Sequence, residues 1–368
     1  MLIGLVAPET SMTQLRMDVV RTDLDLEAGR LLEVRIAGTD VLCQLMDGIN
    51  KEEILFQKNT RGYVLAHAKM IGHWNADKAR FETVRWVPHL NSPVYLVDCC
   101  PATPLRDAVG HFPGTDYPVT VDVDSLVTHN AAILGILGSG KSCLALELVE
   151  RMIAQKIKVI CFDLTDQYAQ ELAVHRVPDE ESKVVDELRG IGNAGKDKVN
   201  QNVEEGGSAL AFKKKVHEQL AGFLGPSKAN YLRIYNPVTF EVWRQDSKPY
   251  QGKASMASLT PTEVTRIFTE AALEVAQSLG MTDRARCCLV FEEAHSIIPE
   301  WSATASEGDR SATNGTAKAI LQGRKFGLGC LVITQRTANV TKSILDQCNT
   351  IFALRVFDAT GTSSAHFA

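Results

Sequence analysis

The segment AAILGILGSGKSCLALELVERMIAQ, residues 131–155, carries three patterns in succession. AAILGIL (131–137) is a fully apolar run typical of a buried strand, and SCLALELVERMIAQ (142–155) has the composition of a helix. They are joined by GILGSGKS (135–142), which matches G-x-x-x-x-G-K-[ST] in full. Because the motif lies where it must, between a strand and a helix, it predicts a phosphate-binding loop.

The residue types of this loop suit a nucleotide. Glycines let backbone N–H groups close around phosphate oxygens, and the start of a helix adds a positive dipole. Lys141 is predicted to reach the β- and γ-phosphates, and Ser142 is predicted to ligate Mg²⁺. We therefore expect ATP and Mg²⁺ as ligands. The predicted nucleotide-binding residues are Gly135, Gly138, Ser139, Gly140, Lys141, Ser142 and Cys143.

The segments that follow the loop predict a parallel sheet. KVICFDL (158–164) is a second buried strand, and strand, helix and strand together form a βαβ unit. Residues 169–235 are charged and mostly helical in character, and Thr260-Pro261-Thr262-Glu263 begins a further helix with a capping box. We interpret residues 169–280 as a helical insertion between two strands of the sheet.

A second motif, CCLVFEEAH (287–295), is an apolar strand that ends in two carboxylates. This pattern fits a Walker B element, in which Glu292 holds the metal with its water shell and Glu293 acts as the general base on the attacking water. Two acidic residues after an apolar run are a weak signal alone, because charged strand ends are common. The phosphate-binding loop makes the functional interpretation the stronger one.

A third motif, GCLVITQR (329–336), places Thr334 and Gln335 at the end of another buried strand. A polar side chain there can contact the γ-phosphate or the water, so we predict Gln335 as a catalytic residue; a solvated strand end is the alternative. A RecA-like sheet has such an extra strand beside the strand of the phosphate loop. ALRVF (353–357) is a candidate fifth strand.

An arginine in the run Gly323-Arg324-Lys325-Phe326-Gly327 is the fourth signal. A ring ATPase closes its site with a neighbour's arginine, which contributes about 10³–10⁵ in rate. Arg324 is the predicted arginine, with Arg336 and Arg355 as competitors. The structural alternative is that Arg324 packs at a helix terminus.

The chain divides into regions of different pattern. Residues 1–100 contain short β-rich runs broken by Gly, Asn, Asp and Pro, which favour a small β-barrel. Residues 101–118 are rich in Pro and Gly and read as a linker, and residues 119–368 as the α/β core.

Composition excludes several classes of protein. Among 368 residues, 45% are hydrophobic and 23% charged, with a net charge of −5, so the chain is not basic throughout. No apolar run approaches the roughly 20 residues that cross a bilayer, and the start lacks a signal-peptide pattern, so we expect a cytoplasmic protein without a membrane partner. Nine cysteines without a CxxC motif are expected to be free thiols, and nine scattered histidines predict no zinc site.

Together these motifs resemble the HerA–FtsK superfamily of ring-forming DNA-pumping ATPases, and its HerA branch in particular. The blocks that resemble HerA are GSGKS (138–142), FEEAH (291–295), GRKFGLGCLVITQR (323–336) and ILDQCNTIFALRV (344–356). Residues 1–100 occupy the place of the HAS-barrel, and residues 169–280 that of the family's helical insertion.

The resemblance implies a HAS-barrel followed by a RecA-like core, assembled as a homo-hexamer. It implies ATP-dependent translocation on double-stranded DNA, with a nuclease or a sirtuin-like NADase effector docked on the barrel, in phage defence or DNA end processing. A different class of function also fits, in which the ring is an ATP-dependent assembly scaffold with little or no DNA pumping. A secretion or conjugation coupling ATPase shares the same core but usually has a membrane partner.

The chain departs from the family pattern in two places. Asp163-Leu164-Thr165-Asp166-Gln167-Tyr168 stands where the family often has D-P-H-G-E-Y, so Gln167 replaces an acid. ATGTSSAHFA (359–368) has no fold signal, whereas HerA proteins usually continue well past ALRV. By resemblance the chain is C-terminally short, and we expect an open sheet edge there.

Overall fold

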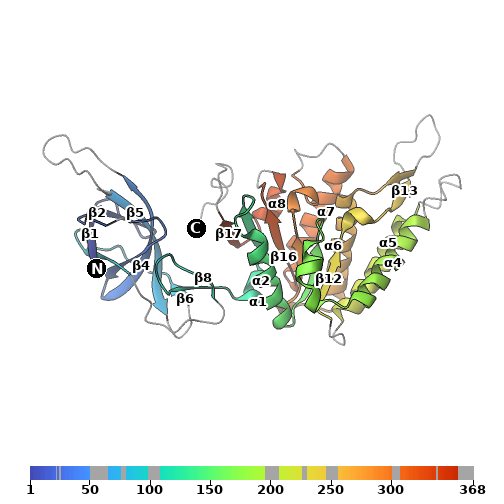
Figure 1. Ribbon diagram of the computed structural model, residues 1–368, viewed down its shortest axis with the longest axis horizontal. Helices are drawn as coiled ribbons and strands as arrows, with labels where there is room; N and C mark the ends of the chain where they lie inside the picture. Colours follow the sequence, from blue (N-terminus) through green and yellow to red (C-terminus); the bar gives the residue numbers. More distant parts are fainter. Residues whose placement is uncertain are drawn as a thin grey trace. The chain divides into compact units, whose positions relative to one another are not determined.

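The computed structural model contains two compact units, Met1–Asp122 and Val123–Ala368, which are described separately below. Both are drawn in Figure 1. The structure describes the whole chain except residues 22, 25, 50–64, 76–79, 98–107, 195–206, 226–229, 246–255, 301–306, 337–338 and 355–368.

The first unit is built on a closed β-barrel, as the sequence predicts. Its strands are β1 (Leu2–Val6), β2 (Gln14–Val19), β3 (Leu31–Ile36), β4 (Thr39–Ile49), β5 (Leu65–Asn75), β6 (Arg80–Glu82) and β7 (Pro93–Leu96). They pair in the order β2-β1-β7-β3-β4-β5-β6, and a further pairing of β2 with β5 closes a six-stranded ring. Alternate side chains fill the interior, where Leu15, Val34 and Leu45 are fully buried.

The stretch predicted as a linker, 101–118, differs from that expectation in its described part. Residues 108–120 form a hairpin of β8 (Ala108–His111) and β9 (Pro118–Thr120). Tyr117 packs with Leu31 and Leu42 of the barrel, and Trp74 meets its ring edge to face. The Pro and Gly residues here therefore make turns within the first unit.

The second unit is built on a six-stranded parallel sheet. Its strands are β10 (Ala131–Gly135), β11 (Lys158–Phe162), β12 (Leu232–Tyr235), β15 (Thr282–Phe291), β16 (Phe326–Thr334) and β17 (Thr350–Leu354). The order is β12-β11-β15-β16-β10-β17, with parallel register throughout. β16 separates the phosphate-loop strand β10 from β15, which confirms the extra strand of a RecA-like sheet.

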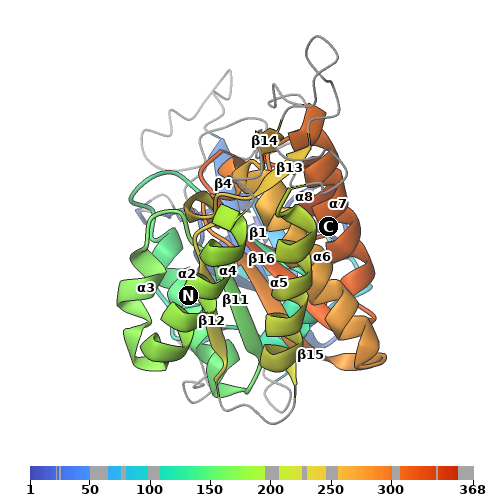
Figure 2. The ribbon, with the colours of Figure 1, turned by 90° about the vertical axis from the view of Figure 1, so that its right-hand side faces the viewer.

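Helices cover both faces of this sheet, and several lie side by side in Figure 2. The helices are α1 (Val123–Thr128), α2 (Lys141–Ala154), α3 (Gln167–Glu171), α4 (Pro178–Ala194), α5 (Ala209–Leu224), α6 (Pro261–Ser278), α7 (Glu307–Gly323) and α8 (Lys342–Leu345). α1 packs on β15 and β16, and α2 on β10 and β11. The apolar sides of α5, α6 and α7 join the opposite face of the sheet in one core.

Within residues 169–280 the chain is mostly helical but also supplies β12 to the sheet and a small hairpin, β13 (Trp243–Gln245) with β14 (Met256–Ser258). α6 begins with the predicted capping box, since Thr260 accepts from the Glu263 backbone and the Glu263 side chain accepts from that of Thr260. The last described strand, β17, ends at Leu354, so the end of the predicted strand 353–357 lies outside the described residues.

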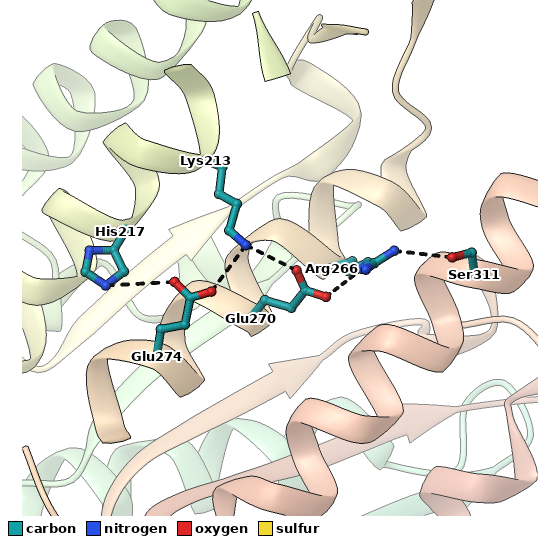
Figure 3. A network of polar contacts seen from close by, with 6 residues as sticks. All are labelled: Lys213, His217, Arg266, Glu270, Glu274 and Ser311. Atoms are coloured by element: carbon teal, nitrogen blue, oxygen red, sulfur yellow. Dashed lines mark hydrogen bonds and ion pairs between the residues drawn. The ribbon is translucent and has the colours of Figure 1, made fainter. Parts of the chain in front are cut away.

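A network of charged side chains joins α5 to α6 and α7 (Figure 3). Lys213 Nζ lies 3.2 Å from Glu274 Oε1 and 3.6 Å from Glu270 Oε2, and Arg266 Nε donates to Glu270 Oε1 at 2.6 Å. Lys215 pairs with Glu187 of α4 at 3.0 Å. Two of the three lysines in the run 213–215 therefore connect helices.

Candidate functional site

The predicted motifs meet at one edge of the parallel sheet. β10, β11, β15 and β16 all run in the same direction, so their carboxyl ends lie together. The phosphate loop follows β10, Glu292 and Glu293 follow β15, and Gln335 follows β16. Motifs that are far apart in the sequence thus form a single site.

The phosphate loop requires glycine at specific positions. Gly138 and Gly140 have positive φ angles of 75° and 92°, a region that residues with a Cβ rarely adopt. A Cβ on Gly135 would lie 2.1 Å from the backbone oxygen of Leu354 on β17. Lys141 is buried, and its Nζ donates to the backbone oxygen of Ile136 within the same loop at 2.9 Å. The ammonium group is therefore already held inside the loop that would receive phosphates.

A pocket of about 430 Å³ opens at this edge. It is lined by Leu137, Gly138, Gly140, Lys141, Ser142, Cys143, Thr165, Gln167, Glu292, Glu293 and Gln335. Most of the residues predicted to bind the nucleotide, and three of the four predicted catalytic residues, thus face one cavity. Gly135 and Ser139 lie in the loop itself, where Ser139 Oγ donates to Ile136 at 2.8 Å.

Glu292 is a buried carboxyl group beside other acids. Burial is the main reason that its pKa is raised to about 7, and the neighbouring Glu293 and Asp163 add to the shift. Two groups oppose it: the Tyr168 hydroxyl, which donates to Glu292 Oε2 at 2.9 Å, and the Lys141 ammonium. A cation beside such a buried carboxyl group stabilises its charged form.

Glu293 has both a strained backbone and an unpaired oxygen. Its φ is 46°, in the left-handed region that is rare for glutamate and that clusters at functional sites. Gln335 Nε2 donates to Glu293 Oε1. The other oxygen is buried, lies 3.2 Å from Nδ1 of His295 and receives no hydrogen bond from the described residues. That oxygen is free to accept a proton from a water molecule.

Burial is the main reason that the pKa of His295 is lowered, so the surroundings disfavour a charged ring beside Glu293. The pair of Glu293 with Gln335 therefore brings a candidate base and a candidate phosphate sensor into direct contact before any nucleotide is bound.

The residues present fit a Mg²⁺ ion held together with a nucleotide. Mg²⁺ prefers oxygen ligands and usually binds through one or two carboxylates together with substrate phosphates. Ser142 and Glu292 line the same pocket and offer a hydroxyl and a carboxyl oxygen. Within the described residues no group of three or more His, Cys, Asp and Glu side chains could form an all-protein metal site.

Arg324 lies away from this pocket. It is exposed and precedes β16, whereas Gln335 follows that strand. The nine residues of β16, at about 3.3 Å each, span roughly 30 Å, which no side chain bridges. Of its competitors, Arg336 is exposed and follows β16 beside the pocket, and Arg355 lies outside the described residues.

Three residues of the site belong to the loop 163–168, which the sequence analysis named as a departure from the family pattern without assigning its residues a role. Thr165 and Gln167 line the pocket, and Tyr168 is buried against Glu292. Asp163 shapes their loop, because its carboxylate accepts from the Thr165 and Tyr168 backbones at 2.9 Å. Thr165, Gln167 and Tyr168 could have been predicted from their position, because they follow the buried strand 158–162. The same kind of position, directly after a buried strand, identified Glu292 and Gln335.

Comparisons with known proteins find related sequences. Residues 107–273 match the family model described as the central domain of helicase HerA. The chain is 22% identical to the probable helicase MJ1565 of Methanocaldococcus jannaschii over 410 residues, covering 94% of this chain and 77% of that protein.

Similar solved structures include the genome packaging NTPase B204 of Sulfolobus turreted icosahedral virus 2. Its complex with ATP-gammaS has a TM-score of 0.35 at 11% identity and covers 66% of this chain and 81% of that chain. Its complex with AMPPCP has a TM-score of 0.35 at 14% identity, covering 64% and 80%.

Residues 107–273 of this chain are thus similar to the central domain of helicase HerA. The family match covers the phosphate loop and the residues up to α6, and the alignment with the archaeal helicase extends over nearly the whole chain. Among the described residues, no helix is long and apolar enough to cross a membrane.

Proposed function

We propose that this chain is an ATP-hydrolysing ring motor that moves along double-stranded DNA as a homo-hexamer. One observation carries the proposal. The pocket at the carboxyl edge of the sheet collects Lys141, Glu293 and Gln335, while Arg324 is exposed at the opposite edge. A ring of copies is the simplest assembly in which an arginine of one chain can complete the pocket of the next.

Within one pocket the roles follow from chemistry. Lys141 would exchange its bond to the Ile136 oxygen for the β- and γ-phosphates, and Ser142 and Glu292 would hold Mg²⁺. Mg²⁺ supplies neutralisation of phosphate charge when bound. Glu293 takes a proton from the attacking water through its unpaired oxygen. Gln335, which donates to Glu293, contacts the γ-phosphate or the water.

Arg324 acts in the pocket of a neighbouring copy. It lies on the core surface, and no carboxylate among the described residues pairs with it, so its charge stays available for a phosphate. Such an arginine is worth about 10³–10⁵ in rate. Arg336 is the weaker candidate, since it already lies on the pocket side of its own chain.

DNA as the substrate is supported by the helicase description of the matching family and by the probable helicase of Methanocaldococcus jannaschii. A net charge of −5 requires the contacts with DNA phosphates to be local. Lys213 and Lys215 are poor candidates, because carboxylates of neighbouring helices hold them. By resemblance, a nuclease or a sirtuin-like NADase docks on the barrel, in phage defence or DNA end processing.

A triplex-displacement assay tests this function. A third strand annealed to linear duplex DNA is released only by an enzyme that moves along the duplex. We expect release in the presence of ATP and Mg²⁺, and none from Lys141→Ala. ATP hydrolysis without release would contradict translocation. If an effector complex also survived Lys141→Ala, the assembly-scaffold function would replace the motor.

A further inference from the structure

Arg324 is not a loose surface side chain. Its Nη2 lies 2.6 Å from Nε2 of His129, in the turn between α1 and β10. His129 is half-buried, and Arg324 is exposed. The contact lies at the amino edge of the sheet, at the opposite end of β10 from the phosphate loop.

The surroundings of His129 determine which ring nitrogen carries the proton. Nδ1 lies 3.0 Å from the backbone oxygen of Ser125, which can only accept, so Nδ1 must donate. Thr128 Oγ1 also lies 3.0 Å from Nδ1, and the hydroxyl donates to the backbone oxygen of Asp124. The oxygen of this Thr128 hydroxyl can therefore accept a hydrogen bond from His129 Nδ1 as well. In the neutral ring, Nε2 is then the acceptor that Arg324 requires.

The backbone around His129 is fixed on several sides. Its N–H donates to Ser125 at 3.1 Å, and its oxygen accepts from Asn349 at 3.1 Å. Asn130, with a φ of 56°, accepts from the Cys330 backbone through Oδ1 at 2.9 Å. The imidazole thus extends from a rigid turn, whereas Arg324 precedes β16 on an exposed surface.

A neutral hydrogen-bond acceptor suits an arginine that must bind a phosphate in the pocket of another copy. A carboxylate would hold Arg324 more strongly, but it would also neutralise the charge that must meet a phosphate. A neutral imidazole fixes the direction of one N–H and leaves the positive charge uncompensated. The guanidinium keeps its other donors for a phosphate oxygen.

We propose that His129 is a positioning residue, which holds Arg324 in the orientation in which it enters the nucleotide pocket of a neighbouring copy. The inference rests on the proposed role of Arg324. His129 lies just before the short strand β10, and the phosphate loop follows this strand. The turn that contains His129 is therefore joined to the chain's own nucleotide site by β10.

Rings of two kinds of subunit test the inference. Lys141→Ala subunits lack a working pocket but still offer Arg324, whereas Arg324→Ala subunits keep the pocket and lack the arginine. Differently tagged subunits are co-expressed and purified through both tags, and ATP hydrolysis is measured. We expect each variant alone to be inactive and the mixed rings to hydrolyse ATP.

His129→Ala is then placed in one kind of subunit at a time. In the Lys141→Ala subunits, which donate the arginine, it should lower the rate of the mixed rings at least tenfold. In the Arg324→Ala subunits it should change the rate by less than twofold. His129→Gln, whose amide oxygen can accept from Arg324, should restore much of the rate when placed in the donating subunit.

Three results would overturn the proposal. An equal loss from both placements would assign His129 a structural role, and no loss from either would show that Arg324 needs no holder. If the mixed rings without a His129 change stay inactive, the role of Arg324 fails first, and this result is distinct from the other two. A subunit-specific loss with rescue by glutamine supports the proposal.

Discussion

Glu293 combines an uncommon backbone conformation with a free carboxylate oxygen. Its φ of 46° turns the chain directly after β15 and brings the side chain to Gln335. Strain of this kind persists only where the surroundings enforce it. Here β15 and the short helical turn Ala294–Ser296 hold the residue from both sides.

Glu293→Gln should remove hydrolysis and leave nucleotide binding intact. The amide keeps the size of the side chain but cannot take a proton from water, so we expect kcat to fall by about 10²–10⁴. ATPase rates and the Kd of a fluorescent ADP analogue measure the two effects. Glu171→Gln, at an exposed site on α3, is the matched control and should be silent. A Glu293→Gln enzyme that hydrolyses ATP normally would contradict the assignment.

Binding of Mg²⁺ with nucleotide should depend on pH through Glu292. The pKa of this group is raised to about 7, and a proton competes with the metal for the carboxylate. Affinity should therefore be highest above pH 7 and fall as pH drops through 7. A pKa near 7 makes the ionised fraction, and the affinity, roughly tenfold lower at pH 6 than at pH 8.

Magnesium titrations of the binding of a fluorescent ADP analogue, at several pH values, measure this effect. Tyr168 lowers the pKa of Glu292 by donating to it, so Tyr168→Phe should move the midpoint to higher pH. An affinity that stays flat between pH 6 and pH 8 would show that Glu292 is not a ligand.

Cys143 offers a chemical probe of the pocket. It is exposed and lines the pocket, whereas the other described cysteines are buried, among them Cys43, whose pKa burial raises to about 12. N-ethylmaleimide should modify Cys143, and ATP with Mg²⁺ should slow this reaction. Mass spectrometry of the Cys143 peptide measures it, with Cys143→Ser as the control. Modification at the same rate with and without nucleotide would place the ligand elsewhere.

At the scale of the element, close packing explains features that the pattern of residues does not reveal. Gly329 on β16 faces the end of α1, where an added Cβ would lie 1.7 Å from the backbone oxygen of Val127. α1 ends directly before His129, and β16 pairs with β10. Gly222 in α5 has no atom within 4 Å of an added Cβ.

Gly329→Ala and Gly222→Ala should therefore change stability in opposite directions. Gly329→Ala forces β16 and α1 apart and should lower the free energy of unfolding by about 2 kcal/mol or more. Gly222→Ala removes flexibility from a helix and should raise the free energy of unfolding by about 0.5–1 kcal/mol. Denaturant unfolding of the ATPase core measures both. A neutral Gly329→Ala would mean that α1 does not pack closely on β16.

The sequence predicts the elements of the core well where pattern and chemistry coincide. The apolar strands that end in GSGKS, EE and TQ identify one sheet edge and its polar residues, because parallel strands bring those ends together. The barrel follows from its short alternating runs. The closure of the barrel by β2 and β5, and the place of β12 at the sheet edge, depend on long-range pairing that no local pattern encodes.

Contacts between residues that are distant in the chain cannot be predicted from local sequence patterns. The hydrogen bond of Tyr168 with Glu292 and that of His129 with Arg324 span 124 and 195 residues of chain. In the same way, Lys213 and Lys215 form ion pairs with carboxylates of neighbouring helices, which a run of lysines in the sequence does not reveal. A side chain's partner is decided by packing.

At the scale of the whole molecule, the arrangement of groups in the ATPase core leads us to expect that a second copy of the chain completes each pocket. One edge of the sheet carries the pocket with Glu293 and Gln335 but without Arg324, and the opposite edge carries Arg324 in contact with His129. In a closed ring every pocket would be completed once. ATP turnover would then depend on assembly, and movement on DNA would pass from one pocket to the next.

The rate of ATP hydrolysis by the wild-type protein, with and without linear double-stranded DNA, is the measurement that tests this account most directly. We predict that DNA raises kcat severalfold or more and that Lys141→Ala abolishes hydrolysis in both conditions. Hydrolysis that is lost in Lys141→Ala but does not respond to DNA would contradict the DNA motor.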